Sequence, residues 1–401
     1  MRLIKTCIYN ANIILPNEVI KGYISIVDDK ITRVSEGWPL MEEADPYATM
    51  IDAQEAYVMP GMIDLHSDAI EKEIQPRPNT FFPVEMAFYE LEKKLAGCGI
   101  TTMYHSLSLS DEWGVRDSET VTGMIDSINK FKSSRSMIAH RIHLRYEITY
   151  LEGIDILVKL INGNCIDFMS YMDHAPGQGQ FKDPEDLKKF TMQSYGKKEK
   201  DVEEFICRTL EYRARIDLSK LKSVALMAGS RGIRLASHDD DTKEKIEALL
   251  EYQGVLSEFP INLETAVFAK RQGLYVCMGA PNVVRGKSHG NNMSAMDAIS
   301  HHAADIICSD YLPSAMLSAV FKMVDNGIRL TEAVKMVTLN PAKAVGIHED
   351  VGSIEEGKKA DLLIVELYHN YPVVRKTVTR GRVVYQSDFS TLIEEGMEKV
   401  C

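Results

Sequence analysis

Residues 141 to 147 read Arg-Ile-His-Leu-Arg-Tyr-Glu, and this stretch decides the fold class. Side chains alternate along a strand, so Ile142, Leu144 and Tyr146 form an apolar face opposite a row of charged and polar residues. An edge strand with one solvated face would show the same pattern. The other interpretation is a barrel wall whose polar face lines the interior, where charged groups must be paired or bound to a metal. The surrounding sequence favours the barrel.

Short apolar segments alternate with helical stretches through the middle of the chain. The predicted strands are residues 61–66, 101–106, 141–147, 166–171, 233–238, 254–260, 275–279 and 305–310. Helical patterns lie between most of them, for example at residues 83–96 and 264–272. An alternation of this number and length is typical of a (β/α)₈ TIM barrel in the α/β class.

Both ends of the chain are rich in β-formers. Residues 8–15, 23–27 and 31–34 near the start, and 360–365 and 373–385 near the end, are predicted strands. Neither end has enough strands for a core of its own. We therefore expect one small β-sandwich domain built from residues 1–56 and 346–401, with the barrel domain, residues 57–345, inserted between them.

Composition narrows the functional classes. The 401 residues are 45% hydrophobic and 26% charged, as in ordinary globular proteins, and the net charge is -12. An acidic chain is a poor match for nucleic acid or an acidic membrane surface, and we expect neither as a partner. Seven cysteines are scattered singly, without a CxxC pair, and we find no secretory signal or long apolar run. These features predict a cytoplasmic protein without a disulfide framework or a membrane span.

Polar residues gather where the predicted strands end. His66 and Asp68 follow the first strand, and alternation places them with Asp64 inside the barrel, while Ile63 and Leu65 point outward. A single histidine at such a position is usually structural, but several on one rim are the residue types that bind borderline divalent metals. The full set is His66, Asp68, Glu147, His174, His238 and Asp310.

This set resembles the amidohydrolase superfamily. Residues 338–344 (Thr-Leu-Asn-Pro-Ala-Lys-Ala) and 352–362 (Gly-Ser-Ile-Glu-Glu-Gly-Lys-Lys-Ala-Asp-Leu) are similar to the return of that superfamily into its β domain. Residues 66–72, 75–78, 172–178, 236–240 and 308–311 are similar to one branch, the PhnM-type diphosphatases of bacterial phosphonate catabolism by the carbon–phosphorus lyase pathway. The similarity covers essentially the whole chain.

The resemblance implies a function. The substrate would be α-D-ribose 1-methylphosphonate 5-triphosphate, hydrolysed to the 5-phosphate and pyrophosphate. His66, Asp68, His174, His238 and Asp310 would bind two divalent ions, with Glu147 bridging them. Zinc is the first expectation, and Mn, Fe or Ni stay open because histidine and carboxylate ligands accept them all. Asp310 would also accept the proton of the attacking water.

A triphosphate on an acidic protein needs cationic contacts. The candidates are Arg77, Arg145, Arg231, Arg285, Lys287 and His289. Residues 279–291 follow the seventh strand, where barrels often bind phosphate, and their glycines predict a phosphate-binding loop. The charged stretch 182–204 is predicted to be a solvated loop and helix start without a function.

Two alternatives remain open at this point. The same barrel could hydrolyse a C–N bond, as a deacetylase, hydantoinase or cyclic deaminase does, although several arginines at the mouth favour a polyanion. A barrel without metal could instead act as a binding protein. The expected partner is a small phosphorylated sugar, and a homodimer is left open.

Overall fold

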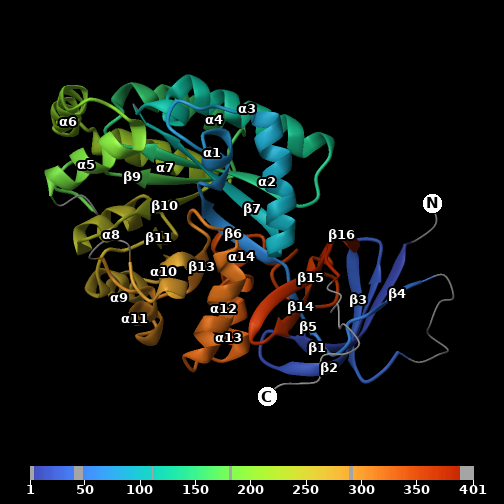
Figure 1. Ribbon diagram of the computed structural model, residues 1–401. Coiled ribbons are helices and arrows are strands. Elements are labelled where there is room, and N and C mark those ends of the chain that lie inside the picture. The colour runs from blue at the N-terminus through green and yellow to red at the C-terminus, as the bar shows by residue number, and fades with distance from the viewer. Residues whose placement is uncertain (1–3, 40–47, 111, 180–182, 289–291, 389–401) are drawn as a thin grey trace, which may run out of the picture.

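The computed structural model describes residues 4–39, 48–110, 112–179, 183–288 and 292–388. The chain forms a parallel barrel surrounded by helices and a separate sheet built from both termini (Figure 1). The barrel strands are β6 (Met62–Ser67), β7 (Ile100–Leu109), β8 (Ala139–Glu147), β9 (Phe168–Met172), β10 (Arg234–His238), β11 (Leu256–Glu258), β12 (Tyr275–Gly279) and β13 (Ile306–Cys308). Their order along the sheet follows the chain, so the predicted (β/α)₈ barrel and its strands are confirmed.

Helices cover the outside of the barrel. Those before β10 are α1 (Ala69–Ile74), α2 (Val84–Cys98), α3 (Ser118–Ser134), α4 (Ile154–Asn162), α5 (Pro184–Tyr195), α6 (Glu199–Arg213) and α7 (Leu218–Ser230). The later helices are α8 (Lys243–Glu251), α9 (Leu263–Arg271), α10 (Ala280–Arg285), α11 (Ala295–Ser300), α12 (Ala315–Asp325), α13 (Leu330–Lys335) and α14 (Leu339–Ala344). Two short 3₁₀ turns, η1 (Gly114–Arg116) and η2 (Leu151–Gly153), precede α3 and α4.

Strand β8 has the two faces that its sequence predicts. Ile142, Leu144 and Tyr146 are almost fully buried in the core between the barrel and its helices. His143 points the other way, with Nε2 3.0 Å from Ser170 Oγ of β9. The charged and polar row therefore faces the interior of the barrel, and the edge-strand interpretation is wrong.

Strand β6 departs from simple alternation. Its pairing with β7 shifts register between Met62 and Ile63 and again between Asp64 and Ser67. Ile63 and Leu65, which we expected to point outward, belong instead to the inner cluster that contains Tyr104 of β7. The expected orientation was wrong because a bulge adds residues to one strand without a partner on the other, which changes the face of each side chain that follows.

The terminal strands form one continuous sheet in the order β16-β15-β14-β5-β1-β2-β3, with β4 also paired to β1. These strands are β1 (Lys5–Ile14), β2 (Val19–Val27), β3 (Lys30–Glu36), β4 (Thr49–Asp52), β5 (Tyr57–Pro60), β14 (Leu362–Tyr368), β15 (Tyr371–Thr379) and β16 (Arg382–Gln386). Apolar side chains from both ends of the chain meet in one core, so the two terminal segments form one unit. Strand β5, which we had assigned to the barrel domain, pairs with β1 and β14 in this sheet.

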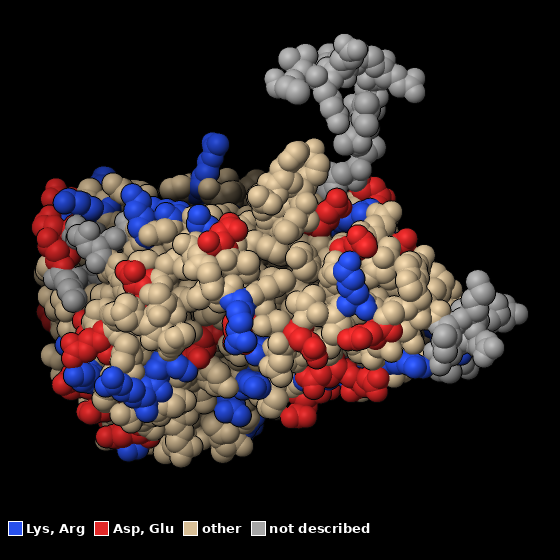
Figure 2. Space-filling model, turned by 90° about the horizontal axis from the view of Figure 1, so that it is seen from below, with Lys and Arg blue, Asp and Glu red and all other residues tan. Residues whose placement is uncertain are grey.

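Charged side chains of both signs are interspersed on the face shown in Figure 2, over the barrel as well as the terminal sheet. No helix among the described residues is both long and apolar enough to cross a bilayer. The charged stretch at residues 182–204 contains all of α5 and the start of α6, which lie beside each other at the edge of the barrel (Figure 1).

Candidate metal centre and substrate pocket

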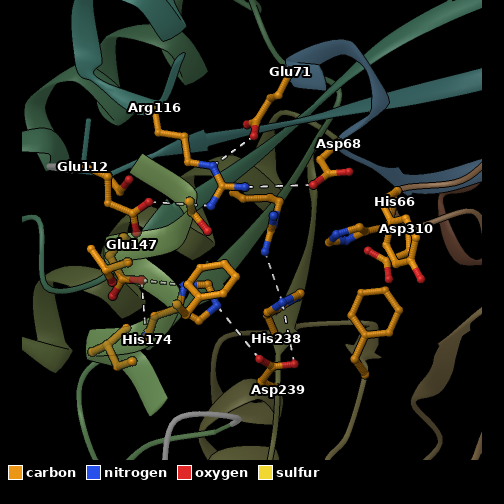
Figure 3. A pocket seen from close by; sticks show the side chains of 18 of the residues that line it. His66, Asp68, Glu71, Glu112, Arg116, Glu147, His174, His238, Asp239 and Asp310 are labelled. Atoms are coloured by element: carbon orange, nitrogen blue, oxygen red, sulfur yellow. Dashed lines mark hydrogen bonds and ion pairs between the residues drawn. The ribbon is translucent and has the colours of Figure 1, made fainter. Parts of the chain in front are cut away.

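A cavity of about 1020 Å³ opens at the carboxyl ends of the barrel strands. This is the end at which TIM-barrel enzymes place their active sites, because the loops that follow the strands converge there. Each of the six predicted metal ligands lines the cavity: His66, Asp68, Glu147, His174, His238 and Asp310. They come from β6, β8, β10 and the segments that follow β6, β9 and β13, and Figure 3 shows them facing a common space.

Glu258 lies at the centre of the first group of possible metal donors. Its Oε2 atom is 3.2 Å from Nδ1 of His66 and 3.4 Å from Nδ1 of His238. Its Oε1 atom is 3.9 Å from Nε2 of His143. Glu258 is fully buried at the end of β11, so an acidic group lies among three imidazoles.

A second group lies on the opposite side of His238. Nδ1 of His174 is 3.2 Å from Oε2 of Glu147, and its Nε2 is 3.9 Å from Oδ2 of Asp239. Oδ1 of Asp239 is 3.7 Å from Nε2 of His238. His174, His238 and Asp239 each offer one ligand atom within 4.8 Å of the others.

Sequence reasoning missed Glu258 and Asp239 as donors. Glu258 lies two residues before the end of the predicted strand 254–260 and is the last residue of β11, so its place near a strand terminus was a usable signal. Asp239 follows His238 directly and has a left-handed backbone, with φ of 55°. Because alternation fails at such a residue, its side chain can join that of His238, which strand periodicity does not predict.

Glu147 is already well bonded to the chain. Its Oε1 atom accepts a hydrogen bond from Thr149 Oγ1 at 3.0 Å. Its Oε2 atom accepts one from the backbone N–H of His174 at 3.3 Å, in addition to the contact with the His174 ring. These contacts orient Glu147 toward His174. Its expected role as a bridge between two metals stays a prediction.

Unpartnered buried oxygens show whether the donor set fits a cation. Asp68 Oδ1, Asp239 Oδ2 and Glu258 Oε1 are buried without a hydrogen-bond partner among the described residues. Buried polar atoms are normally satisfied, because an unpaired one costs free energy. A divalent cation would satisfy several of these oxygens together, so the residues present fit a metal centre.

The protonation of the same residues agrees with this assignment. Burial, assisted by the nearby Arg145 guanidinium, holds the pKa of both His66 and His238 well below the usual range. Both imidazoles are therefore neutral near pH 7 and have a lone pair for a metal. Burial raises the pKa of Asp239 to about 6. Burial, and then the neighbouring Asp68 carboxylate, raise that of Asp310 to about 7.

Asp310 is fixed by its backbone as the barrel closes. Its N–H donates to the carbonyl of His66 at 2.9 Å, and its carbonyl accepts from the N–H of Asp68 at 3.0 Å. Its φ of 57° lies in the left-handed region. A non-glycine residue there is strained and persists because the surrounding structure holds it, which is common at functional sites.

Most of the predicted substrate contacts reach the pocket. Arg77, Arg145, Arg285 and Lys287 line it, whereas Arg231 does not. Arg231 directly follows α7, before β10 begins, and its Nη1 donates to the carbonyl of Asn162 at 3.4 Å. This places it at the amino end of the barrel, so the prediction for Arg231 was wrong. His289 lies outside the described residues.

Two further segments at the pocket differ from expectation. The predicted phosphate loop begins instead with the short helix α10, because Ala280 and Pro281 continue directly from β12. Helices α5 and α6 form one wall of the pocket with Phe190, Thr191, Arg208 and Tyr212, so this segment is no mere solvated loop. We call α5 and α6 together the cap. Because many residues of the cap are charged, its sequence did not predict the apolar and aromatic contacts that it makes.

Comparison with known proteins gives concordant matches. Residues 217–396 match the model of the amidohydrolase family. The chain is 32% identical over 386 residues to the α-D-ribose 1-methylphosphonate 5-triphosphate diphosphatase of Escherichia coli K12, covering 94% of this chain and all of that protein. It is 24% identical to the imidazolonepropionase of Fusobacterium nucleatum, covering 87% of each chain.

A solved structure has the same fold. The N-acetylglucosamine-6-phosphate deacetylase of Pasteurella multocida superposes with a TM-score of 0.61 at 14% identity, over 95% of this chain and 99% of that one.

Proposed function

Because this chain belongs to the amidohydrolase family, we propose that it is a metal-dependent diphosphatase acting on α-D-ribose 1-methylphosphonate 5-triphosphate. The products would be the 5-phosphate and pyrophosphate. One observation carries the proposal: the cavity is lined both by a cluster of metal donors and by several arginine and lysine side chains. A neutral cyclic amide needs no such cations, whereas a triphosphate does.

The candidate metal donors fall into two groups. His66, His238 and Glu258 would hold a divalent ion on one side, and His174 with Asp239 would support the other. Asp68 and Asp310 would complete the set, each with a carboxylate facing the cavity. Bound there, a divalent metal supplies electrophilic stabilisation of the phosphoryl oxygens and makes water a better nucleophile near neutral pH.

Side chains of this protein can accept the proton and bind the phosphates. Asp310 has a carboxylate facing the cavity and can accept the proton of the attacking water. Arg285 and Lys287 follow β12 and face the cavity, where they can hold the terminal phosphates. Arg145 lies deeper, with Nη2 3.1 Å from Nε2 of His238, and can contact the phosphoryl group beside the metal donors.

A substrate panel tests the proposal. Purified protein is assayed with added zinc or manganese against the ribose 5-triphosphate, its 5-monophosphate, a nucleoside triphosphate and an N-acyl amino acid. We expect kcat/KM to be highest for the ribose 5-triphosphate and pyrophosphate to be released. Preferred hydrolysis of the N-acyl amino acid would contradict the proposal and favour C–N bond chemistry.

A further inference from the structure

Arg116 joins three carboxylates beside the candidate metal centre. It ends η1, and its Nε is 2.9 Å from Oε2 of Glu71. Its Nη1 is 3.6 Å from Oε2 of Glu112, and its Nη2 is 4.0 Å from Oδ2 of Asp68 (Figure 3). The Arg116 side chain is only 20% exposed. One guanidinium therefore faces three acidic groups at low exposure, each through a different nitrogen.

Glu71 fixes one end of this arrangement. It is 4% exposed in the first turn of α1, and its Oε1 accepts a hydrogen bond from the backbone N–H of Ser108 at 3.2 Å. Arg116 is thus anchored to β7 through Glu71 and directed toward Asp68. A guanidinium suits this task because its rigid fork of donors can hold several carboxylates in fixed directions.

The cap is attached to the same arrangement. The hydroxyl of Tyr195, the last residue of α5, donates a hydrogen bond to Oε2 of Glu112. Its ring lies 5.7 Å from that of Trp113, which in turn lies 5.2 Å from the ring of Phe205 on α6. Tyr195, Glu112, Arg116 and Asp68 therefore form a continuous series of polar contacts from the cap to a candidate metal ligand.

The other end of the cap is anchored beside a second ligand. Nε and Nη2 of Arg213, at the end of α6, each lie 3.1 Å from Oδ2 of Asp173. Asp173 directly precedes His174. The cap is thus bonded at one end to the neighbour of His174 and at the other, through Glu112 and Arg116, to Asp68, while its inner face lines the cavity.

An oxygen of Asp68 also points to the metal. The carboxylates of Asp68, Glu71 and Glu112 lie around Arg116, and the Lys72 ammonium, 3.8 Å from Asp68 Oδ1, is about half exposed. Asp68 Oδ1 is buried without a hydrogen-bond partner among the described residues. Arg116 is engaged with the other oxygen, Oδ2, which leaves Oδ1 directed for a cation.

We propose that Arg116 is a positioning residue that presents Asp68 to the metal, and that Tyr195 makes metal affinity depend on the seating of the cap. The inference rests on the proposed function only in taking Asp68 as a metal ligand. By thermodynamic reciprocity, metal binding then stabilises the seated cap to the same extent that the seated cap strengthens metal binding. The pocket wall that contacts substrate is thereby ordered together with the metal centre.

Zinc titration of the metal-free protein tests the proposal without using activity. Arg116→Gln should weaken zinc affinity by roughly 10–100-fold, the usual effect of losing a group that orients a ligand. Tyr195→Phe should weaken it by roughly 3–10-fold, because it acts through Glu112 and Arg116. The double variant should bind zinc no more weakly than Arg116→Gln alone, since both changes break the same series of contacts.

A matched control separates this role from general stability. Tyr171→Phe also removes a buried hydroxyl, which donates to the carbonyl of Leu221 at 2.8 Å, outside the pocket. It should bind zinc as the unmodified protein does. Hydrogen exchange gives a second measurement: zinc should slow exchange of the amides of α5 and α6 in the unmodified protein and have little effect on them in Tyr195→Phe.

Two results would overturn the inference. If Tyr195→Phe bound zinc as tightly as the unmodified protein, the cap would not be coupled to the metal centre. If the losses of zinc affinity added up in the double variant, Arg116 and Tyr195 would act on the metal independently. If the unmodified protein takes up zinc and hydrolyses the triphosphate while both variants match it, only this inference fails. If the unmodified protein takes up no metal, the proposed function fails as well.

Discussion

The backbone N–H of Asp310 donates a hydrogen bond to the carbonyl of His66 at 2.9 Å, which joins the last barrel strand to the first. Ser67 and Asp310 form the parallel bridge at this junction. The contact that closes the barrel thus also sets two candidate metal ligands beside each other. Because the contact uses only backbone atoms, the side chain of Asp310 can be changed without opening the barrel.

Asp310→Asn separates the chemical role of this residue from its structural one. The amide keeps one oxygen for a metal but cannot accept a proton from water. We expect the variant to keep its fold and most of its metal, while kcat falls by about 10²–10⁴-fold, the usual contribution of a positioned general base. Thermal melting, metal analysis and steady-state kinetics measure these quantities. Near-normal kcat with the metal retained would remove Asp310 from proton transfer.

Glu258 and Glu147 differ in how their carboxylates are satisfied, and this predicts unequal effects on the metal. Glu258→Gln should lower metal affinity by roughly 10–100-fold, because it removes the negative charge between His66 and His238. Glu147→Gln should cause a smaller loss, at one of two positions, because Thr149 and His174 already bond its oxygens. Metal content per chain measures both. Equal full occupancy in both variants would exclude each as an essential ligand.

Arg285→Ala tests the binding of the terminal phosphates. It should raise KM for the triphosphate more than for an equivalent phosphate monoester, because a distal contact is lost while the metal donors are unchanged. Arg231→Ala is the control, since Arg231 lies outside the pocket and should leave both KM values as they are. If Arg285→Ala raised KM equally for both substrates, Arg285 would contact a part of the substrate other than the terminal phosphates.

Metal affinity should rise with pH through the interval from about 6 to about 7, where Asp239 and Asp310 titrate in the metal-free protein. Below this interval both carboxyl groups hold a proton, which a metal must displace, so apparent affinity falls. Above it both carboxyl groups are ionised, and burial keeps His66 and His238 neutral. Burial lowers the pKa of His174, but the hydrogen-bonded Glu147 outweighs it and raises that pKa above its usual value, so release of the His174 proton extends the rise in affinity. Zinc calorimetry in buffers of different ionisation enthalpy measures the released protons. Affinity that does not change between about pH 6 and about pH 8 would contradict this assignment.

The barrel could be predicted because it follows from strand periodicity, and the residue types near the strand ends indicated most of the candidate site. Alternation fixes the polar row on β8, whereas Asp68, His174 and Asp310 follow the ends of their strands. Where alternation fails, prediction failed too. The register shifts in β6 reversed the expected directions of Ile63 and Leu65, and the left-handed backbone at Asp239 brought in an unexpected donor.

Contacts between distant segments could not be predicted from local patterns. The cap has many charged residues, yet Tyr195 and Phe205 pack on Trp113, which lies far from them in sequence. Arg231 has the residue type that a triphosphate requires but lies at the wrong end of α7. Residue type identified candidate cations, and only the three-dimensional arrangement determined which of them face the cavity.

The most direct test of the central claim is ³¹P NMR of the reaction products. Protein stripped of metal with a chelator is incubated with α-D-ribose 1-methylphosphonate 5-triphosphate, before and after a divalent metal is restored. We predict no turnover without metal, and stoichiometric pyrophosphate and 5-phosphate once it is restored. Release of orthophosphate in place of pyrophosphate, or an intact triphosphate in the presence of metal, would contradict the account.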